Sequence, residues 1–289
     1  MRRHISYIPR RLAALIRRYQ RIKGPVPDGG GLVLGLNRWM LDEGEGLVIS
    51  DSNGDAHGYI SEDAVYTQWV DTPEGGPPQT KCLEIVYNEN ADADIEGAVT
   101  GLTRIEGQPM MPMTIEAWVR LSDVFDGTLN LGVHNASFVT HNANHPAETY
   151  PNICFDFGFG SGNPNKPLFV SFESGDVAEY FYVISTAAPL EVSVWNHWAV
   201  TVDQLGNGVV LKNGDVVTSS ISSNEDVVYV SSDPEPYCIG KSGPGTWASA
   251  LSRHRRICYG MMADIRIWDH VRTQQQIQDN MYATKNSIV

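Results

Sequence analysis

The sequence contains no apolar run long enough to cross a lipid bilayer, which argues against a membrane-spanning helix. It has only four cysteines, Cys82, Cys154, Cys238 and Cys258, and none forms a C-x-x-C pair, so a zinc site is not indicated. It has no phosphate-binding glycine loop, because its glycines lie in turn-like stretches. Arginines interrupt the apolar residues near the start, so we expect no secretory signal peptide.

Charge is divided unevenly along the chain. Residues 1–23 carry eight Arg and Lys residues and no Asp or Glu. The remainder holds 13 of the 21 basic residues and all 34 acidic residues, which gives it a net charge of −21. We expect the acidic body to repel nucleic acid, whereas the basic arm should seek an acidic surface. The two parts are therefore expected to have different functions.

The basic arm, residues 1–23, has the spacing of an amphipathic helix. Its apolar residues from Ile8 onward recur at intervals of four and three, which places them on one stripe with arginines on the other faces. We expect a helix near residues 9–23, because Pro9 suits a first turn and Gly24-Pro25 ends it. Residues 24–31 then form a Pro- and Gly-rich linker. The residues expected to anchor the arm are Arg10, Arg11, Leu12, Leu15, Arg17, Arg18, Tyr19 and Ile22.

A helix of this length is marginally stable alone in water, so its apolar stripe needs a partner. The stripe could join a larger protein assembly, form a homo-oligomeric bundle, lie on a membrane surface or pack on the chain's own domain. The same features also suit an organelle-targeting segment that is later removed. We favour anchoring to a protein assembly, with a virion as the leading case, which would place the protein on a virion or another external surface.

Four segments of the last third of the chain read as β-strands, because apolar residues alternate with polar ones. They cover residues 195–202, 209–217, 238–241 and 259–269. Within the second segment, Asn213-Gly214 predicts a tight hairpin, since both central residues of a type I′ turn need positive φ.

In this order, the segments resemble the laminin G-like, concanavalin A-like lectin-glucanase jelly-roll family. Residues 39–46 look like the family's first strand, residues 51–58 like its Gly-, Asn- and Asp-rich turn, and residues 113–120 like its central strand. The resemblance implies an all-β, two-sheet antiparallel jelly-roll sandwich over residues 32–289, carried on the N-terminal arm. A T-x-x-Q capping box, Thr273 to Gln276, predicts a short C-terminal helix. Longer loops are expected over residues 134–190.

The family resemblance also implies a calcium ion that pins the first turn to the last strand. The matching positions are Asp51, Asn53 and Asp264, whose oxygen atoms are the ligands that calcium requires. The alternative is that Asp51 and Asn53 only form Asx turns and that Asp264 faces solvent. In the same fold, Cys238 and Cys258 would open neighbouring strands, so they could form a disulfide, although small buried thiols are the favoured interpretation.

Two clusters of side chains suggest chemistry without completing a site. Asp92, Asp94 and Glu96 alternate as the paired carboxylates of a glycosidase strand do, but their acidic, Ala-rich surroundings favour a solvated loop and no catalysis. His141 and His145 have the spacing of a helical zinc pair, but neighbouring Asn and Pro residues favour a loop here too.

Aromatic rings and Asn side chains outside the clear core pattern are candidates for glycan binding, because sugar rings pack on flat aromatic faces. We expect a non-catalytic, lectin-like display or decoration protein, anchored by its arm. A purely structural capsid or tail component is the alternative, and a glycoside hydrolase or polysaccharide lyase is the third. The candidate glycan-binding residues are Trp69, His134, Asn135, Tyr150, Tyr180, Tyr182 and Trp247.

Overall fold

The computed structural model covers the whole chain, which divides into two compact units, residues 1–32 and 33–289. Only the second unit contains described residues. They are residues 35–54, 56–88, 96–103, 113–125, 136–143, 152–159, 168–173, 180–184, 191–203, 207–218, 220–222, 236–241 and 257–284. The expected arm helix, the linker and all the anchoring residues lie outside this part of the chain.

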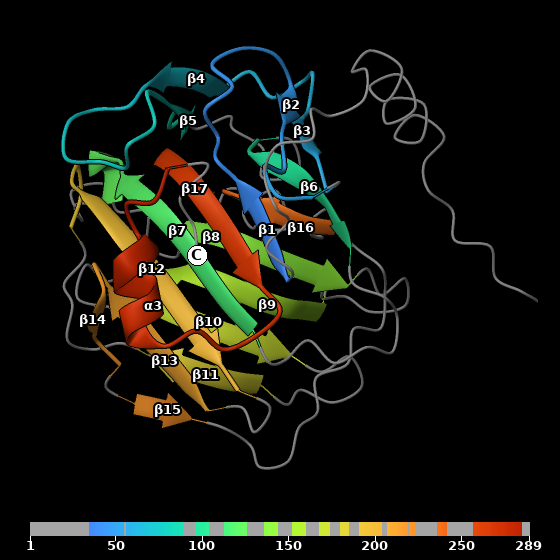
Figure 1. The fold of residues 1–289 in the computed structure, drawn as a ribbon. Helices are drawn as coiled ribbons and strands as arrows, with labels where there is room; N and C mark the ends of the chain where they lie inside the picture. The colour runs from blue at the N-terminus through green and yellow to red at the C-terminus, as the bar shows by residue number, and fades with distance from the viewer. Residues whose placement is uncertain are drawn as a thin grey trace, which may run out of the picture. The chain divides into compact units, whose positions relative to one another are not determined.

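Sheet A is antiparallel and has the strand order β14-β13-β12-β7-β17-β5-β4, with β1 pairing on β17 (Figure 1). β7 lies near its centre, as expected for residues 113–120, and pairs with β12 and β17. The strands are β1 (Leu36–Trp39), β4 (Thr67–Asp71), β5 (Lys81–Ile85), β7 (Met113–Leu121), β12 (Trp195–Val202), β13 (Gly208–Lys212), β14 (Asp215–Val216) and β17 (Gly260–Trp268).

Sheet B is also antiparallel and has the order β15-β11-β10-β9-β8-β16-β6-β3-β2. Its strands are β2 (Val48–Ile49), β3 (Gly58–Ile60), β6 (Ala98–Thr103), β8 (Ala136–Ala143), β9 (Asn152–Phe159), β10 (Leu168–Glu173), β11 (Tyr180–Ile184), β15 (Ser220–Ser222) and β16 (Pro236–Ile239). A single 3-10 turn, η1 (Asp123–Phe125), follows β7 within the described residues.

The two sheets pack face to face around one apolar core, which is the arrangement of a β-sandwich. Sheet A contributes Trp39, Ile115 and Val200, and sheet B contributes Phe138 and Phe157. These side chains are almost completely buried. The two phenylalanine rings meet edge to face, with centroids 5.5 Å apart. The predicted all-β sandwich is therefore confirmed.

The hairpin predicted at Asn213-Gly214 joins β13 to β14. Both residues have positive φ, 52° and 84°, as a type I′ turn requires. Lys212 pairs with Asp215 on either side of the turn. The local signal was sufficient here because the turn chemistry alone specifies the connection.

Residues 134–190, where longer loops are expected, also contain strands, and the loop predicted around His141 is wrong. This stretch contains β8, β9, β10 and β11, four neighbouring strands of sheet B. His141 belongs to β8, where it pairs with Phe155 and Tyr237, and is not in a loop. The neighbouring Asn and Pro residues favoured a loop because composition describes propensity, whereas sheet pairing also depends on distant partners.

The first strand of sheet A, β1 (Leu36–Trp39), lies earlier than the expected residues 39–46 and shares only Trp39 with them. β1 ends at Trp39, and the following segment turns through positive φ at Leu41, Gly44 and Gly46. The predicted Gly-, Asn- and Asp-rich turn lies between β2 and β3. Most of residues 39–46, which the family resemblance assigned to the first strand, therefore form a turn.

The predicted C-terminal helix is α3 (Gln274–Asn280), and both bonds of its capping box are present at Thr273 and Gln276. Ile277 of α3 packs against Ala199 and Leu211, which lie on the face of sheet A that points away from the core. We call this the outer face of sheet A. Figure 1 shows α3 lying across it.

Replacing Thr273 by Ala should lower the free energy of unfolding by about 1 kcal/mol, because the amide of Gln276 then loses its side-chain acceptor. For a domain of this size, that loss corresponds to a fall in Tm of about 2–4 °C, measurable by calorimetry. The exposed helix residue Gln275 provides the control, as Gln275→Ala leaves the cap intact. Equal Tm values for the two variants would contradict the role of the cap.

Candidate functional site

The turn expected to bind calcium is closed by its own hydrogen bonds. Oδ1 of Asp51 accepts from the amides of Arg38 and Asn53, each at 3.0 Å. Oδ2 accepts from Nδ2 of Asn37 at 2.7 Å and from the amide of Ala56 at 3.3 Å. Four donors therefore engage the Asp51 carboxylate, and the turn has the Asx geometry that we considered as the alternative to a metal site.

Asp264 is completely buried, so it does not face solvent, and a β-bulge orients it. Between Ala263 and Arg266 the pairing of β17 with β7 shifts register. Asp264 has a φ of 51°, a left-handed conformation that Asp tolerates better than most residues. Its amide donates to the carbonyl of Met40 at 3.0 Å. Bulges re-aim side chains in this way.

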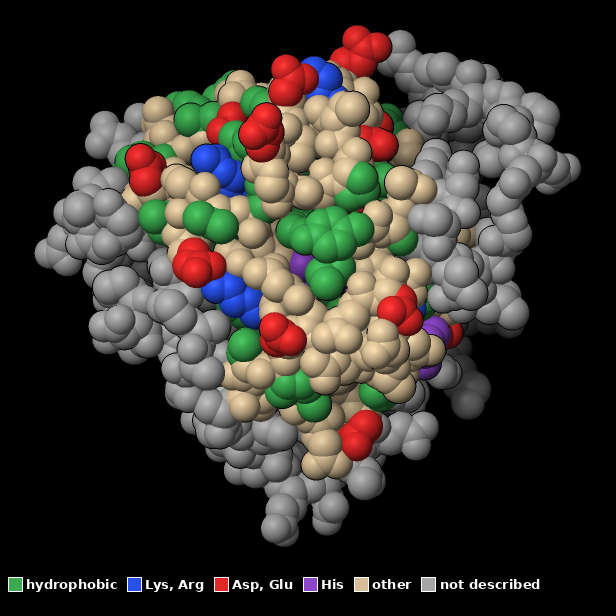
Figure 2. Space-filling model, turned by 60° about the vertical axis from the view of Figure 1, so that its left-hand side comes forward, with side chains coloured by type: hydrophobic (Ala, Val, Ile, Leu, Met, Phe, Trp, Pro, Cys, Tyr) green, Lys and Arg blue, Asp and Glu red, His purple; other side chains and the backbone are tan. Residues whose placement is uncertain are grey.

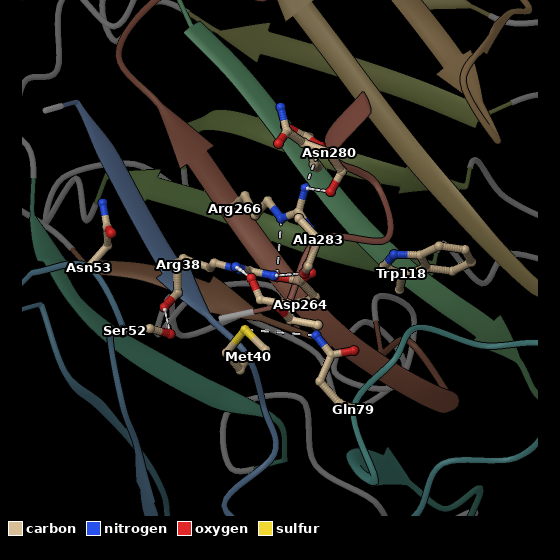
Figure 3. Close-up of polar contacts among 12 residues, drawn as sticks. Arg38, Met40, Ser52, Asn53, Gln79, Trp118, Asp264, Arg266, Asn280 and Ala283 are labelled. Carbon is tan, nitrogen blue, oxygen red and sulfur yellow. Dashed lines mark hydrogen bonds and ion pairs between the residues drawn. The ribbon is translucent and has the colours of Figure 1, made fainter. Parts of the chain in front are cut away.

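Two arginines bind the Asp264 carboxylate (Figure 3). Arg38 donates through Nε to Oδ1 at 2.6 Å and through Nη2 to Oδ2 at 2.8 Å. Arg266 donates through Nε to Oδ1 at 3.1 Å and through Nη2 to Oδ2 at 2.5 Å. Burial alone would raise the pKa of Asp264, but the charges of Arg266 and Arg38 lower it below its usual value. The carboxylate is therefore ionised and doubly paired.

Glu116 of β7 extends this network across the outer face of sheet A. Its carboxylate accepts from Nε1 of Trp268 at 2.7 Å and from Nη1 of Arg266 and of Arg272, each at 3.2 Å. Nε2 of His197 lies 3.3 Å from Oε2. Burial would raise the pKa of Glu116, but Arg266, His197 and Arg272 outweigh it and lower the pKa to about 2.

Together these groups form a buried arginine–carboxylate cluster, defined as Arg38, Glu116, Asp264, Arg266 and Arg272. Each of the five is at most 3 % exposed. A charge in so dry a place is tolerated only when it is paired and hydrogen-bonded, and the contacts above satisfy that requirement. The carboxylates of the cluster are thus buried and bonded within the protein.

The cluster also holds the end of α3 and the turn that follows it. Arg266 donates to the carbonyl of Asn280, the last residue of α3, at 2.8 Å. Carbonyls at a helix C-terminus lack partners within the helix and attract positive charge, so the guanidinium group suits this one. Arg38 donates to the carbonyls of Ala283 at 2.6 Å and Thr284 at 3.0 Å, in the turn after the helix.

One of the three carboxylates considered for glycoside hydrolysis is described, and it is buried. Glu96 is 2 % exposed, and it accepts from the amide of Tyr66 and, at 2.5 Å, from Oγ1 of Thr67. The prediction of a solvated loop is therefore wrong for Glu96, whose contacts fix the start of β4. Asp92 and Asp94 lie outside the described residues.

The predicted glycan-binding residues are not brought together within the described part of the chain. Trp69 lies on the edge strand β4, half-buried against the core, and its Nε1 donates to the carbonyl of Gly46 at 2.9 Å. Tyr180 and Tyr182 are residues of β11 in sheet B. The remaining candidates lie outside the described residues: His134, Asn135, Tyr150 and Trp247.

The outer face of sheet A carries an aromatic group that the sequence did not suggest. Tyr282 is 60 % exposed and stacks obliquely on the buried Trp118, with ring centroids 5.3 Å apart. Trp118 in turn donates through Nε1 to the carbonyl of Met281 at 2.9 Å. Figure 2 shows hydrophobic side chains gathered near the middle of the face in view. No sequence signal singled out Tyr282, because its exposure depends on how the chain continues beyond α3.

The cysteines of the described part are buried thiols, as the favoured interpretation had it. Cys82, Cys238 and Cys258 form no disulfide. Burial raises the pKa of Cys82 to about 11, so that thiol is protonated at neutral pH. The disulfide considered between Cys238 and Cys258 is absent. Among the described residues, no group of three His, Cys, Asp or Glu side chains could hold a metal ion.

Comparison of the sequence with known protein families agrees with the observed strand order. The sequence profile of the concanavalin A-like lectin/glucanases superfamily matches residues 102–278. The chain belongs to this superfamily. Its strands β7 to β17 and most of α3 fall within the match. No curated protein matches the sequence. No described helix is long and apolar enough to span a membrane.

Solved structures share this superfamily fold at low sequence identity. Domain 4 of AbnA, an extracellular arabinanase from Geobacillus stearothermophilus solved with arabinotriose, matches at a TM-score of 0.52 and 14 % identity, over 84 % of this chain and 96 % of that one. The binding domain of Paraclostridial Mosquitocidal Protein 1 matches at 0.55 and 14 %, over 84 % and 50 %. The Trypanosoma rangeli sialidase, solved with sialic acid, matches at 0.51 and 12 %, over 96 % and 39 %.

Acid should destabilise the protein through the cluster. The pKa of Glu116 is about 2 in the folded chain against an ordinary 4.5, so its contribution is complete above pH 4.5 and is lost as the pH falls towards 2. Glu116→Gln should flatten this acid limb and lower the free energy of unfolding at pH 7 by about 3–5 kcal/mol, since Arg266 and Arg272 lose their counter-charge. Urea unfolding followed by tryptophan fluorescence at stepped pH measures both effects.

The matched control is Glu62→Gln, which neutralises an exposed carboxylate and should leave the pH profile unchanged. A Glu116→Gln protein as stable as the wild type at pH 7 would show that the cluster does not depend on this charge.

Proposed function

We propose that this chain is a non-catalytic, lectin-like display protein, whose jelly-roll domain binds carbohydrate and whose basic arm anchors it to a larger assembly. The observation that carries the proposal is the combination of superfamily membership with buried carboxylates that are bonded inside the protein. Glu116 and Asp264 are held by arginines, and Asp51 and Glu96 are held chiefly by amide and hydroxyl donors. A glycosidase needs two carboxylates facing the sugar, and these four do not supply them.

Carbohydrate as the ligand is supported by the fold and by candidate aromatic residues. The same fold in domain 4 of the arabinanase holds arabinotriose in that protein. Here Trp69 presents part of its ring at the edge of sheet A, and Tyr180 and Tyr182 lie on β11 of sheet B. An aromatic face with nearby hydrogen-bonding groups is the arrangement that pyranose rings require.

A glycoside hydrolase is the second candidate, and Glu43 is the observation that favours it. Burial raises the pKa of Glu43, and its Oε2 has no hydrogen-bond partner, whereas Oε1 accepts from the amide of Ser50. A buried carboxyl group whose pKa is raised is the kind of group that serves as a proton donor in glycosidases. We assign Glu43 instead to stabilising its turn, because its Oε1 accepts from the amide of Ser50.

Glycan-array binding by the full chain tests the carbohydrate proposal. Tyr180→Ser and Tyr182→Ser should each weaken binding about tenfold, the change produced by losing about 1.4 kcal/mol of contact with the sugar. Tyr282→Ser removes an exposed tyrosine outside the candidate set and should bind as the wild type does. A folded full chain that retains no glycan would overturn the proposal. Cleavage of the same oligosaccharides by the wild-type chain would also overturn it, if the Glu43→Gln variant no longer cleaved them.

The anchoring proposal rests on the apolar stripe of the basic arm, residues 1–23. When a lysate of the producing cells is separated on a sucrose gradient, the full chain should sediment with dense particles. The double variant Leu12→Asp with Leu15→Asp should stay in the low-density fractions at the top of the gradient. Arg2→Gln with Arg3→Gln lies outside the stripe and should sediment as the wild type does. If instead both double variants sedimented normally, the stripe would not be the anchor. Flotation with phosphatidylserine vesicles would identify a membrane surface as the partner.

A further inference from the structure

Four oxygen atoms converge on the guanidinium group of Arg38. They are Oδ1 and Oδ2 of Asp264, at 2.6 and 2.8 Å, and the carbonyls of Ala283 and Thr284, at 2.6 and 3.0 Å. They come from the middle of β17 and from the turn after α3. Figure 3 shows the side chain of Arg38 reaching from β1 towards this group.

These are the kinds of oxygen that a calcium ion takes, but a side-chain cation is already bonded to them. Calcium needs six to eight oxygen ligands at about 2.3–2.6 Å. The Asp264 carboxylate has both oxygens bonded by Arg38 and again by Arg266. A divalent ion bound at Asp264 would lie beside two fixed positive charges in a dry interior, where like charges repel strongly. The residues present therefore do not fit the ion that the family resemblance implies.

The contacts of the Asp51 turn also argue against a shared calcium ion, because Arg38 bonds this turn as well. The amide of Arg38 donates to Asp51, while the side chain of Arg38 donates to Asp264. The hydroxyl of Ser52 and its amide both donate to the carbonyl of Arg38. The turn and the last strand are thus joined through one residue, Arg38, rather than through a shared ion.

We propose that Arg38 takes the place of the calcium ion as the cation that joins the first turn, the last strand and the C-terminal segment of this domain. The connection is permanent, because a side chain cannot dissociate or be chelated. The fold therefore forms without calcium. If the proposed carbohydrate binding is correct, a calcium ion at Asp51 and Asp264 plays no part in it either.

Thermal unfolding of the full chain in EDTA and in millimolar calcium chloride tests the proposal without any sugar. We expect the two Tm values to agree within about 1 °C. An ion bound here at a hundred times its Kd would raise Tm by about 5 °C or more. Such a rise, lost in Asp51→Asn, would overturn the proposal. A rise that Asp51→Asn keeps in full comes from an ion elsewhere and agrees with it.

A second pair of variants tests the arginine itself. Arg38→Met should lower Tm by about 5 °C or more, equally in both buffers, because Asp264 and two carbonyls lose their donor. Arg120→Met is the matched control, since Arg120 is a partly exposed arginine of the same sheet outside the cluster. Equal Tm values for the two variants would overturn the role of Arg38. If Arg38→Met does not fold, the wild-type comparison still decides the question of the ion.

Glycan binding measured in the same two buffers separates this inference from the proposed function. Binding that is unchanged by EDTA supports both. Binding lost in EDTA while Tm stays constant places an ion at the sugar site and agrees with the role of Arg38 in the fold. Absence of binding in both buffers removes the proposed function but leaves the Tm result, and with it the proposal on Arg38, standing.

Discussion

Charge neutralisation inside the outer layer of sheet A is the constraint on which the domain depends. An ion removed from water loses several kcal/mol of solvation, and only close, well-oriented partners offset the loss. Glu116 and Asp264 meet this condition by bonding to arginines from β1, β17 and the segment before α3. Because the loss of one partner leaves a buried charge unpaired, these elements stabilise one another. The network is thus a determinant of which strands become neighbours as much as a source of stability.

The β-bulge in β17 is what makes the network geometrically possible. In an unbroken strand, consecutive residues point to opposite faces, so Ala263 and Asp264 could not both lie on the outer side. The extra residue in β17 breaks that rule, and Asp264 adopts the left-handed backbone that follows from it. Arg266 and Trp268 then regain the regular alternation and reach Glu116. The bulge at Asp264 therefore links the strand pairing of sheet A to the arginine–carboxylate cluster on its outer face.

How far the sequence predicted this structure depended on whether a feature was local. The hairpin at Asn213-Gly214 and the capping box at Thr273 are specified by neighbouring residues, and both were found. Arg38 and Asp264 are 226 positions apart, so no short-range pattern could pair them. β8 to β11 were missed for the same reason, since their stability comes from partners across sheet B. Of the described aromatic candidates, Trp69 lies on sheet A whereas Tyr180 and Tyr182 lie on sheet B, because short-range patterns do not say which strands become neighbours.

The strand order of sheet A has a consequence for how the protein is made. β17 leaves the ribosome after every other strand of sheet A, yet it lies inside the sheet, where it pairs with β1, β5 and β7. Until residues 260–268 emerge, β7 and β5 have a bare edge each, and Arg38 has no carboxylate to bind. Contacts this distant in sequence slow folding. The nascent chain therefore has unpaired strand edges until β17 is synthesised. Chaperones that shield such edges should affect its yield more than the stability of the folded domain does.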